Sequence, residues 1–316
     1  MRYKLLGRSG LRVSELALGT MTFGPEWGWG ASKDESRRMF DAYAEAGGNF
    51  LDTANRYTEG TSERYVGEFI ASDRDHWVVA TKDTLWMRRD DPNFSGNHRK
   101  NMVQALDASL KRLGTDYIDL YWVHAWDFTT PTSEVMRALD DMVRAGKVLH
   151  VGISDTPAWV VSRANTLAEL RGWSPFVALQ LRYSLIDRTA ERDLIPMARA
   201  MDMAITPWSI LGAGTLTGKY SRGATPTSTA SLAAAGVLAT TRTTSPGAGR
   251  SASRTTVRSA SVSMAASTST GGPGSGTRVR LSSRKLTWAW IVGSTAGPSV
   301  DPMGRSVRLG DQRRPS

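Results

Sequence analysis

Cysteine is absent from this 316-residue chain. Its absence excludes disulfide bonds, a thiol nucleophile and any metal site built on cysteine sulfur. A chain without cysteine has no need of an oxidising compartment, which fits a reducing one such as the cytoplasm. We therefore expect a cytoplasmic protein, and no group of residues in the sequence predicts a metal site.

Long apolar runs are also missing. No stretch approaches the roughly 18 apolar residues that a membrane-spanning helix requires. The N-terminus carries Arg2, Lys4 and Arg8 where a signal peptide would have an apolar run. These features predict that the protein has no membrane partner.

Acidic residues become scarce in the last third of the chain, which carries the whole excess of positive charge. Residues 1–220 hold 27 basic and 28 acidic residues, whereas residues 221–316 hold 13 and 2, giving a formal net charge of +10. A basic chain suggests nucleic-acid binding. However, no aromatic residue occurs between Tyr220 and Trp288, so the basic segment lacks the stacking side chains of a single-strand binder. We expect no nucleic-acid partner.

Residues 221–285 have an anomalous composition, consisting mostly of Ser, Thr, Ala, Gly and Arg. Such a segment holds too few apolar side chains to offset the entropy lost on ordering. Two explanations are open: an intrinsically disordered segment, or a frame slip that leaves the segment mis-sequenced.

The first 208 residues alternate short apolar runs with longer amphipathic segments. The apolar runs are LALGTMTF (16–23), NFLDT (49–53), WVVATK (77–82), YIDLYWVH (117–124), KVLHVGIS (147–154), FVALQL (176–181) and MAITPW (203–208). The helical segments between them are 33–46, 62–72, 98–113, 133–145, 157–171 and 189–200. Continuous apolar runs are typical of strands buried on both faces, and strands alternating with helices indicate a parallel sheet.

This pattern predicts an α/β fold, a single (β/α)8 (TIM) barrel domain spanning residues 1–316 and preceded by a short N-terminal β-hairpin. An open doubly wound sheet is the structural alternative. No glycine-rich phosphate loop follows the first strand, which disfavours a dinucleotide-binding fold of that kind.

Polar side chains follow three consecutive predicted strands. The second strand ends at Asp52, with Tyr57 five residues later; the third ends at Lys82 and the fourth at His124. Each residue alone has an ordinary explanation, such as a helix cap, a solvated lysine or a core histidine. Barrel enzymes carry their chemistry at this end of the strands, so the joint arrival of all four favours an active site.

The four residues are chemically complementary. A tyrosine hydroxyl is a weak acid with a pKa of about 10, which a neighbouring ammonium lowers. Lys82 can supply that ammonium, Asp52 can hold it, and His124 can donate a hydrogen bond to a substrate oxygen. Such a group protonates a carbonyl oxygen while a hydride from a nicotinamide reaches the carbon.

The chain resembles the aldo-keto reductase family, in the branch of bacterial reductases and potassium-channel β-subunits. The resemblance covers about residues 1–220. Its motifs are ALGTMTFG (17–24), NFLDTANRYTEGTSERYVGEF (49–69), ATK (80–82), DLYWVHAWD (119–127), GKVLHVGISD (146–155), ALQLRYSLIDR (178–188) and TPWSILGAGTLTGKY (206–220). The resemblance implies a (β/α)8 barrel that uses NADPH to reduce an aldehyde or ketone reversibly.

The resemblance also assigns roles to residues. It implies that Asp52, Tyr57, Lys82 and His124 form the catalytic tetrad, with Tyr57 as the acid in reduction and the base in oxidation. Matches to the family's cofactor-binding positions are Thr20, Met21, Asp52, Ser154, Asp155, Gln180, Trp208, Ser209, Ile210, Leu211, Gly212 and Lys219. Ser154, Asp155 and Gln180 match the residues that hold the nicotinamide carboxamide, and Trp208 matches the ring stacked on it.

The chain departs from the family pattern at three places. Position 155 is often Asn or Arg and here is Asp, which accepts hydrogen bonds but, when ionised, donates none. Position 210 is usually Pro and here is Ile. The family's last unit includes its eighth strand and an element that binds the adenosine 2′-phosphate. In this chain LTWAWIV (286–292) and GRSVRLGDQ (304–312) resemble that region only weakly. The choice of NADPH over NADH therefore follows the family habit rather than these residues.

Four tryptophans follow the predicted strands: Trp27, Trp29, Trp86 and Trp126. They fit either ordinary loop packing or an apolar pocket that accepts an aromatic substrate. We expect a small-molecule carbonyl substrate as the partner and leave the oligomeric state open. The alternative function is a nucleotide-binding regulatory subunit with little turnover, like the channel β-subunits.

Overall fold

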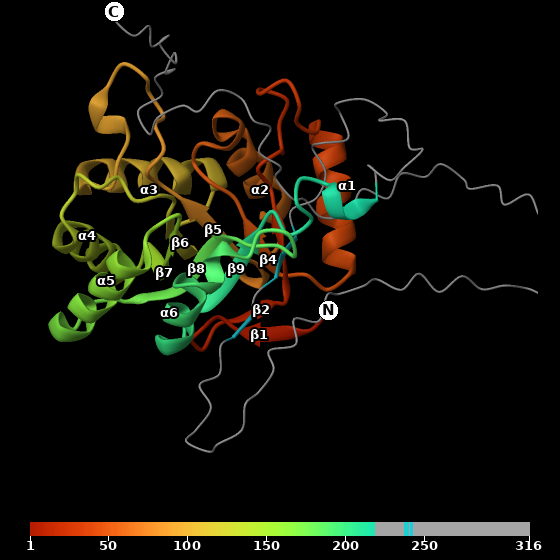
Figure 1. Cartoon of the computed structure of the whole chain (residues 1–316). Coiled ribbons are helices and arrows are strands. Elements are labelled where there is room, and N and C mark those ends of the chain that lie inside the picture. The colour runs from red at the N-terminus through yellow and green to blue at the C-terminus, as the bar shows by residue number, and fades with distance from the viewer. Residues whose placement is uncertain (219–236, 240, 243–316) are drawn as a thin grey trace, which may run out of the picture. The chain divides into compact units, whose positions relative to one another are not determined.

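Residues 1–218, 237–239 and 241–242 are described by the computed structural model of this chain (Figure 1). These residues belong to one compact unit. Most of the anomalous segment 221–285, the predicted cofactor residue Lys219 and the faint family echoes at 286–292 and 304–312 lie outside the described residues.

The predicted N-terminal hairpin is present. Strand β1 (Tyr3–Leu5) pairs antiparallel with β2 (Arg12–Ser14). Leu6 and Val13 are fully buried against side chains of the barrel interior. The hairpin therefore closes the N-terminal end of the barrel, opposite the strand ends that carry the polar residues.

Seven consecutive parallel strands form the main sheet, in chain order. They are β3 (Leu16–Gly19), β4 (Phe50–Asp52), β5 (Val78–Lys82), β6 (Ile118–Val123), β7 (Val148–Ser154), β8 (Phe176–Arg182) and β9 (Ala204–Trp208). The interior strands are almost wholly buried, as their continuous apolar runs predict. The sheet is curled, and the α/β barrel class is confirmed.

The eighth position of the ring is filled differently from the predicted parallel strand. Strand β10 (Val237–Ala239) pairs antiparallel with β3, and β11 (Thr241–Arg242) pairs antiparallel with β9. One short stretch of chain thus pairs with both edge strands of the parallel sheet. It supplies hydrogen-bond partners to strand edges that would otherwise be unpaired.

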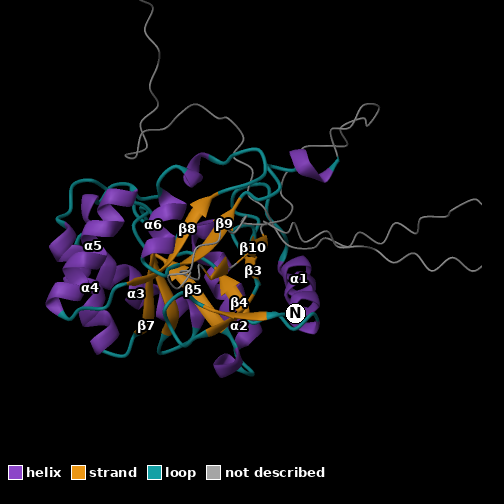
Figure 2. Ribbon diagram, turned by 60° about the horizontal axis from the view of Figure 1, so that its bottom comes forward, coloured by secondary structure: helices purple, strands orange, loops and turns teal. Residues whose placement is uncertain are grey.

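Six helices in the described residues cover the outside of the sheet (Figure 2). They are α1 (Lys33–Glu45), α2 (Thr61–Ile70), α3 (Arg99–Leu113), α4 (Thr132–Arg144), α5 (Ala158–Arg171) and α6 (Leu194–Ala200). Five short 3-10 helices, η1 (Tyr57–Gly60), η2 (Arg74–His76), η3 (Pro92–Phe94), η4 (Thr189–Glu191) and η5 (Thr215–Thr217), lie in the connections.

Two hydrophobic layers hold this arrangement. The larger lies between the sheet and the helices, and it includes Phe40, Met102, Tyr121 and Leu139. The smaller fills the barrel interior, where Phe50, Leu120 and Trp122 are fully buried. A packed interior gives the upper ends of the strands a rigid base, and this base fixes the spacing of the residues described next.

Candidate active site

Three neighbouring strands deliver the predicted catalytic residues to one end of the barrel. Asp52 is the last residue of β4, Lys82 is the last residue of β5, and His124 directly follows β6. The register pairs Asp52 with Ala80 and Lys82 with Trp122, which keeps these strand ends level. Parallel pairing alone therefore brings these side chains together.

Tyr57 reaches the same place by a tight turn. It opens η1, in which Thr58 and Glu59 have left-handed backbone angles, with φ of 45° and 55°. The Thr58 hydroxyl donates to the carbonyl of Phe23 at 2.6 Å and accepts from the amide of Ser62 at 3.1 Å. These bonds hold a backbone conformation that non-glycine residues seldom adopt.

Lys82 is the centre of the site. Its ammonium donates to Asp52 Oδ2 at 2.5 Å, to the carbonyl of Thr53 at 2.8 Å and to the Tyr57 hydroxyl at 3.1 Å. The lysine side chain has no exposed surface. All three of its N–H groups have an acceptor, so the buried charge is both paired and fully hydrogen-bonded.

His124 completes the group. Its ring meets the Tyr57 ring edge-on, with centroids 5.9 Å apart. Burial, together with the charge of Lys82, holds the pKa of His124 well below its usual value. The imidazole is therefore neutral and can donate one hydrogen bond. Its Nδ1 has no partner among the described residues.

Burial and neighbouring charges shift the pKa values of Lys82 and Tyr57 in opposing directions, which the sequence did not reveal. Burial lowers the pKa of Lys82, but Asp52 and Tyr57 outweigh it and the net pKa is raised. Burial raises the pKa of Tyr57, and the opposing charge of Lys82 only partly offsets this effect. The predicted effect of Lys82 on the tyrosine is therefore present, but burial, which the sequence did not show, is larger and leaves the pKa of Tyr57 above its ordinary value.

Several of the predicted cofactor residues lie beside this group. Gln180 on β8 donates to Asp52 Oδ1 at 3.1 Å, so it is tied directly to the Lys82 partner. Ser154 is buried at the end of β7, and Trp208 is the last residue of β9. Asp155 follows β7 and hydrogen-bonds with Trp208.

The predicted contacts of the first loop are less direct. Thr20 is fully buried, and its hydroxyl lies 3.1 Å from the Asp52 carbonyl and 2.8 Å from the Ser62 hydroxyl. Its amide also donates to the Asp52 carbonyl, at 2.9 Å. The structure thus places Thr20 behind Asp52 as a support. Met21, the next residue, is partly exposed.

The segment after β9 is a series of tight turns. Ser209 and Ala213 have φ of 60° and 55°, and Gly212 and Gly214 are also left-handed. Ser209 is buried, while Ile210, Leu211 and Gly212 are partly exposed. This loop lies at the carboxyl end of β9, next to Trp208, where the resemblance predicts the pyrophosphate loop.

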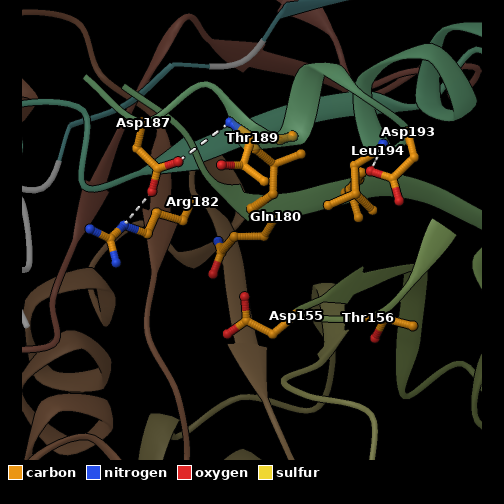
Figure 3. Close-up of a pocket in the computed structure, with 11 residues that line it drawn as sticks. Asp155, Thr156, Gln180, Arg182, Asp187, Thr189, Asp193 and Leu194 are labelled. Carbon is orange, nitrogen blue, oxygen red and sulfur yellow. Dashed lines mark hydrogen bonds and ion pairs between the residues drawn. The ribbon is translucent and has the colours of Figure 1, made fainter. Parts of the chain in front are cut away.

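A cavity of about 330 Å³ opens beside the predicted nicotinamide residues (Figure 3). It lies over the ends of β7 and β8 and under the connection to α6. Its lining residues are Asp155, Thr156, Leu179, Gln180, Leu181, Arg182, Asp187, Thr189, Ala190, Asp193 and Leu194. Asp155 and Gln180, both predicted to hold the carboxamide, share this wall.

The tryptophans at the rim form a cluster that includes a residue the sequence did not single out. The Arg56 guanidinium lies over the Trp86 ring at 3.9 Å and over the Trp27 ring at 6.0 Å. Trp27 and Trp29 are 5.6 Å apart, while Trp126 is nearly buried elsewhere at the rim. Arg56 directly precedes Tyr57, so the strand-end pattern already placed it near the site. No sequence rule predicts that its guanidinium stacks on the tryptophan rings.

Asp83 is a second residue that the sequence pattern did not single out. It follows Lys82, is fully buried, and one of its carboxylate oxygens has no partner among the described residues. Burial raises its pKa to about 7. A carboxyl next to a predicted catalytic lysine was the available signal, but burial was not visible in the sequence.

The described residues contain neither a metal-binding cluster nor a membrane-spanning helix. No three acidic, histidine or cysteine side chains are arranged there to hold a metal ion. None of the helices in that part of the chain is long and apolar enough to cross a membrane.

Comparison with known proteins identifies the family. The model of the aldo/keto reductase family matches residues 15–265, extending past the region that carries the motifs. Norsolorinic acid reductase of Aspergillus flavus is 46% identical over 220 residues, covering 66% of this chain and 57% of that protein. Aryl-alcohol dehydrogenase (NADP(+)) of Phanerodontia chrysosporium is 44% identical over 219 residues, covering 65% and 57%.

These relatives also bear on the predicted branch. They come from fungi, and they do not support a place beside bacterial reductases and potassium-channel β-subunits. The motifs behind that prediction resemble the family in general, so they did not separate its branches. The chain spans a little over half the length of these relatives. With the family model matching well over half of the chain, this protein belongs to the aldo/keto reductase family.

Proposed function

We propose that this chain is an NADP(H)-dependent oxidoreductase that interconverts an aromatic aldehyde or ketone and the corresponding alcohol. The observation that carries the proposal is the Lys82 ammonium, bonded at once to Asp52 and to the Tyr57 hydroxyl. That arrangement couples a phenol to a buried positive charge, which is the requirement for moving a proton to or from a carbonyl oxygen.

The residues present fit a nicotinamide cofactor. Ser154, Gln180 and Trp208 lie at the ends of three neighbouring strands, and Gln180 is linked to Asp52. Two hydrogen-bonding side chains beside an indole suit an aromatic ring with a carboxamide. When bound, the cofactor supplies or accepts the hydride at the carbonyl carbon.

The side chains of the tetrad manage the proton. In reduction the Tyr57 hydroxyl donates its proton to the carbonyl oxygen, and Lys82 stabilises the phenolate that remains. Asp52 and the Thr53 carbonyl hold the lysine in place. Neutral His124 donates a hydrogen bond to the same carbonyl oxygen. In alcohol oxidation Tyr57 takes the proton back.

An aromatic substrate is supported by the rim and by the relatives. The Arg56 guanidinium, next to Tyr57, lies over the Trp86 and Trp27 rings, and Trp27 contacts Trp29. Indole rings at the rim suit a flat ligand. The named relatives are a reductase of norsolorinic acid and an NADP(+)-dependent dehydrogenase of aryl alcohols. We also propose a cytoplasmic location and a small-molecule partner rather than a nucleic acid.

A turnover assay tests the proposal. Purified chain is mixed with NADPH and benzaldehyde, NADPH consumption is followed by its absorbance, and benzyl alcohol is identified by chromatography. The proposal expects aldehyde-dependent consumption of NADPH with one alcohol formed per NADPH. Tight NADPH binding with no turnover on a panel of aromatic and aliphatic aldehydes would instead favour a nucleotide-binding regulatory subunit.

A further inference from the structure

Asp155 occupies an unusual position in the site. It follows β7 with a left-handed φ of 37°, a conformation that aspartate and asparagine adopt more readily than other non-glycine residues. Figure 3 shows its carboxylate on the wall of the cavity that it shares with Gln180. Asp155 is exposed, and its carboxylate hydrogen-bonds with the Trp208 side chain. Desolvation raises the pKa of this carboxyl above its ordinary value, while Lys82 and the bond with Trp208 oppose the shift, so the carboxylate is studied at a pH well above neutral.

The cavity beside Asp155 is lined by three carboxylates, Asp155, Asp187 and Asp193, and by one cation, Arg182. Asp52 and Lys82 form an ion pair of their own, and Arg182 is paired with Asp187 at 3.1 Å. His124 and Tyr57 are neutral, as their shifted pKa values indicate. Within the described part of the chain, no arginine or lysine forms an ion pair with Asp155. Its electrostatic partners are Lys82, already used by Asp52, and the hydrogen bond with Trp208.

A fixed carboxylate distinguishes the two redox forms of a nicotinamide. The ring of the oxidised form carries a positive charge, and the ring of the reduced form is neutral. A carboxylate several ångströms from that ring attracts the oxidised form by a Coulomb energy that corresponds to about a tenfold or larger change in affinity. An asparagine at the same position has nearly the same shape and no charge.

We propose that Asp155 makes this site discriminate between the two redox forms of the cofactor, binding oxidised NADP+ more tightly relative to NADPH than an uncharged side chain at this position would. The inference rests on the proposed function, because it requires the nicotinamide ring to lie beside Gln180 and Trp208. It assigns to Asp155 a charge-dependent role in choosing the redox state of the cofactor, beyond simply holding the carboxamide.

Direct binding measurements test this role without relying on turnover. NADP+ and NADPH are titrated separately by isothermal titration calorimetry, at about pH 8, into the 316-residue wild-type chain and its Asp155→Asn, Asp155→Glu and Asp187→Asn variants. Asp155→Asn is expected to weaken NADP+ binding about tenfold and to leave NADPH binding unchanged or slightly tighter. Asp155→Glu keeps the charge and is expected to retain the wild-type preference.

Asp187→Asn is the matched control. It removes a carboxylate from the same cavity wall, but one that is already paired with Arg182. The ratio of the two Kd values is expected to stay within about twofold of wild type. Equal weakening of both cofactors by Asp155→Asn, or an equal change of the ratio in Asp187→Asn, would overturn the inference. Failure of the wild-type protein to bind either cofactor would overturn the proposed function itself.

Discussion

At the scale of single residues, the proposed chemistry depends on a buried lysine, Lys82, whose three N–H groups all donate hydrogen bonds. A lone ammonium in the barrel interior would lose its charge, because desolvation favours the neutral amine. Asp52 prevents this loss at Lys82. The same lysine has one hydrogen bond left for Tyr57, so the structural ion pair and the proposed proton-transfer site share one side chain.

Replacing this lysine tests both functions at once. Lys82→Met is expected to abolish measurable turnover and to lower the free energy of unfolding by about 3–5 kcal/mol, because Asp52 is left charged and buried without a partner. Chemical denaturation and the turnover assay measure the two effects. Lys147→Met removes an exposed lysine paired with Asp107 and should leave both nearly unchanged. Full activity in Lys82→Met would refute the role given to this residue.

Asp83 gives the protein a predictable pH dependence. Burial raises its folded-state pKa from 3.8 to about 7, so the folded state binds a proton more tightly than the unfolded chain does. The contribution of Asp83 to stability is then full below about pH 4 and is lost as the pH rises through 7, by up to about 4 kcal/mol.

The Asp83→Asn variant removes this titration. It is expected to have a higher Tm than wild type at pH 8 and a similar Tm at pH 4, as measured by differential scanning calorimetry. Asp107→Asn, which changes an exposed carboxylate on α3, should show the wild-type pH dependence. The assignment fails if Asp83→Asn and wild type lose stability equally between pH 4 and pH 8.

The sequence predicted which residues meet, but not their electrostatic state. Asp52, Lys82 and His124 come together because parallel pairing levels the strand ends, and a sequence pattern contains that information. The raised pKa of Tyr57 depends on how completely protein surrounds the phenol, which spacing does not encode. The stacking of Arg56 on Trp86 depends on two loops approaching each other, and it was missed for the same reason.

At the scale of secondary-structure elements, the helix patterns located five of the six helices to within two residues. The exception is the segment 189–200, predicted as one helix and observed as η4 followed by α6. Asp193 separates them and caps α6, its carboxylate accepting from the Leu194 amide at 2.7 Å. Pro196 is tolerated because it lies in the first turn of α6, where a missing N–H costs little.

A buried ion pair links two of these helices. Arg112 on α3 donates to Glu63 on α2 at 2.5 Å, and Glu63 also accepts from the Thr81 hydroxyl of β5. Arg112→Ala is expected to cost about 3–5 kcal/mol, because Glu63 is completely buried and would lose its cation. Arg2→Ala, which breaks an exposed pair with Glu15, should change little. Equal denaturation midpoints for the two variants would contradict this assignment.

The N-terminal hairpin supplies a second test at this scale. Gly7 has φ of 56°, and a Cβ there would overlap the Val177 carbonyl oxygen at the floor of the barrel. Gly7→Ala is therefore expected to lower the Tm by several degrees, consistent with a cost of at least about 1 kcal/mol. Gly10→Ala is the matched control, since its added methyl group would meet nothing. Equal melting temperatures for the two variants would contradict the close packing of Gly7 against the Val177 carbonyl.

At the scale of the whole molecule, the distribution of charge separates the part of the chain that carries the predicted barrel pattern from the part that does not. Residues 1–220, nearly neutral with 27 basic and 28 acidic residues, contain the strand ends, the tetrad and the cavity. The repeating pattern there predicted the barrel because each unit buries its own strand. The antiparallel strands at the eighth position were not predicted, because no periodic pattern marks 237–239 and 241–242, which pair with β3 and β9.

The central claim is that Tyr57 transfers the proton to the substrate while the rest of the site binds the cofactor. The most direct test compares wild type with Tyr57→Phe, which removes one hydroxyl and keeps the ring, measuring kcat for an aromatic aldehyde and the Kd of NADPH on the same preparations. We predict a loss in kcat of at least about a hundredfold with the Kd within about twofold of wild type. A variant that keeps its kcat would contradict the account.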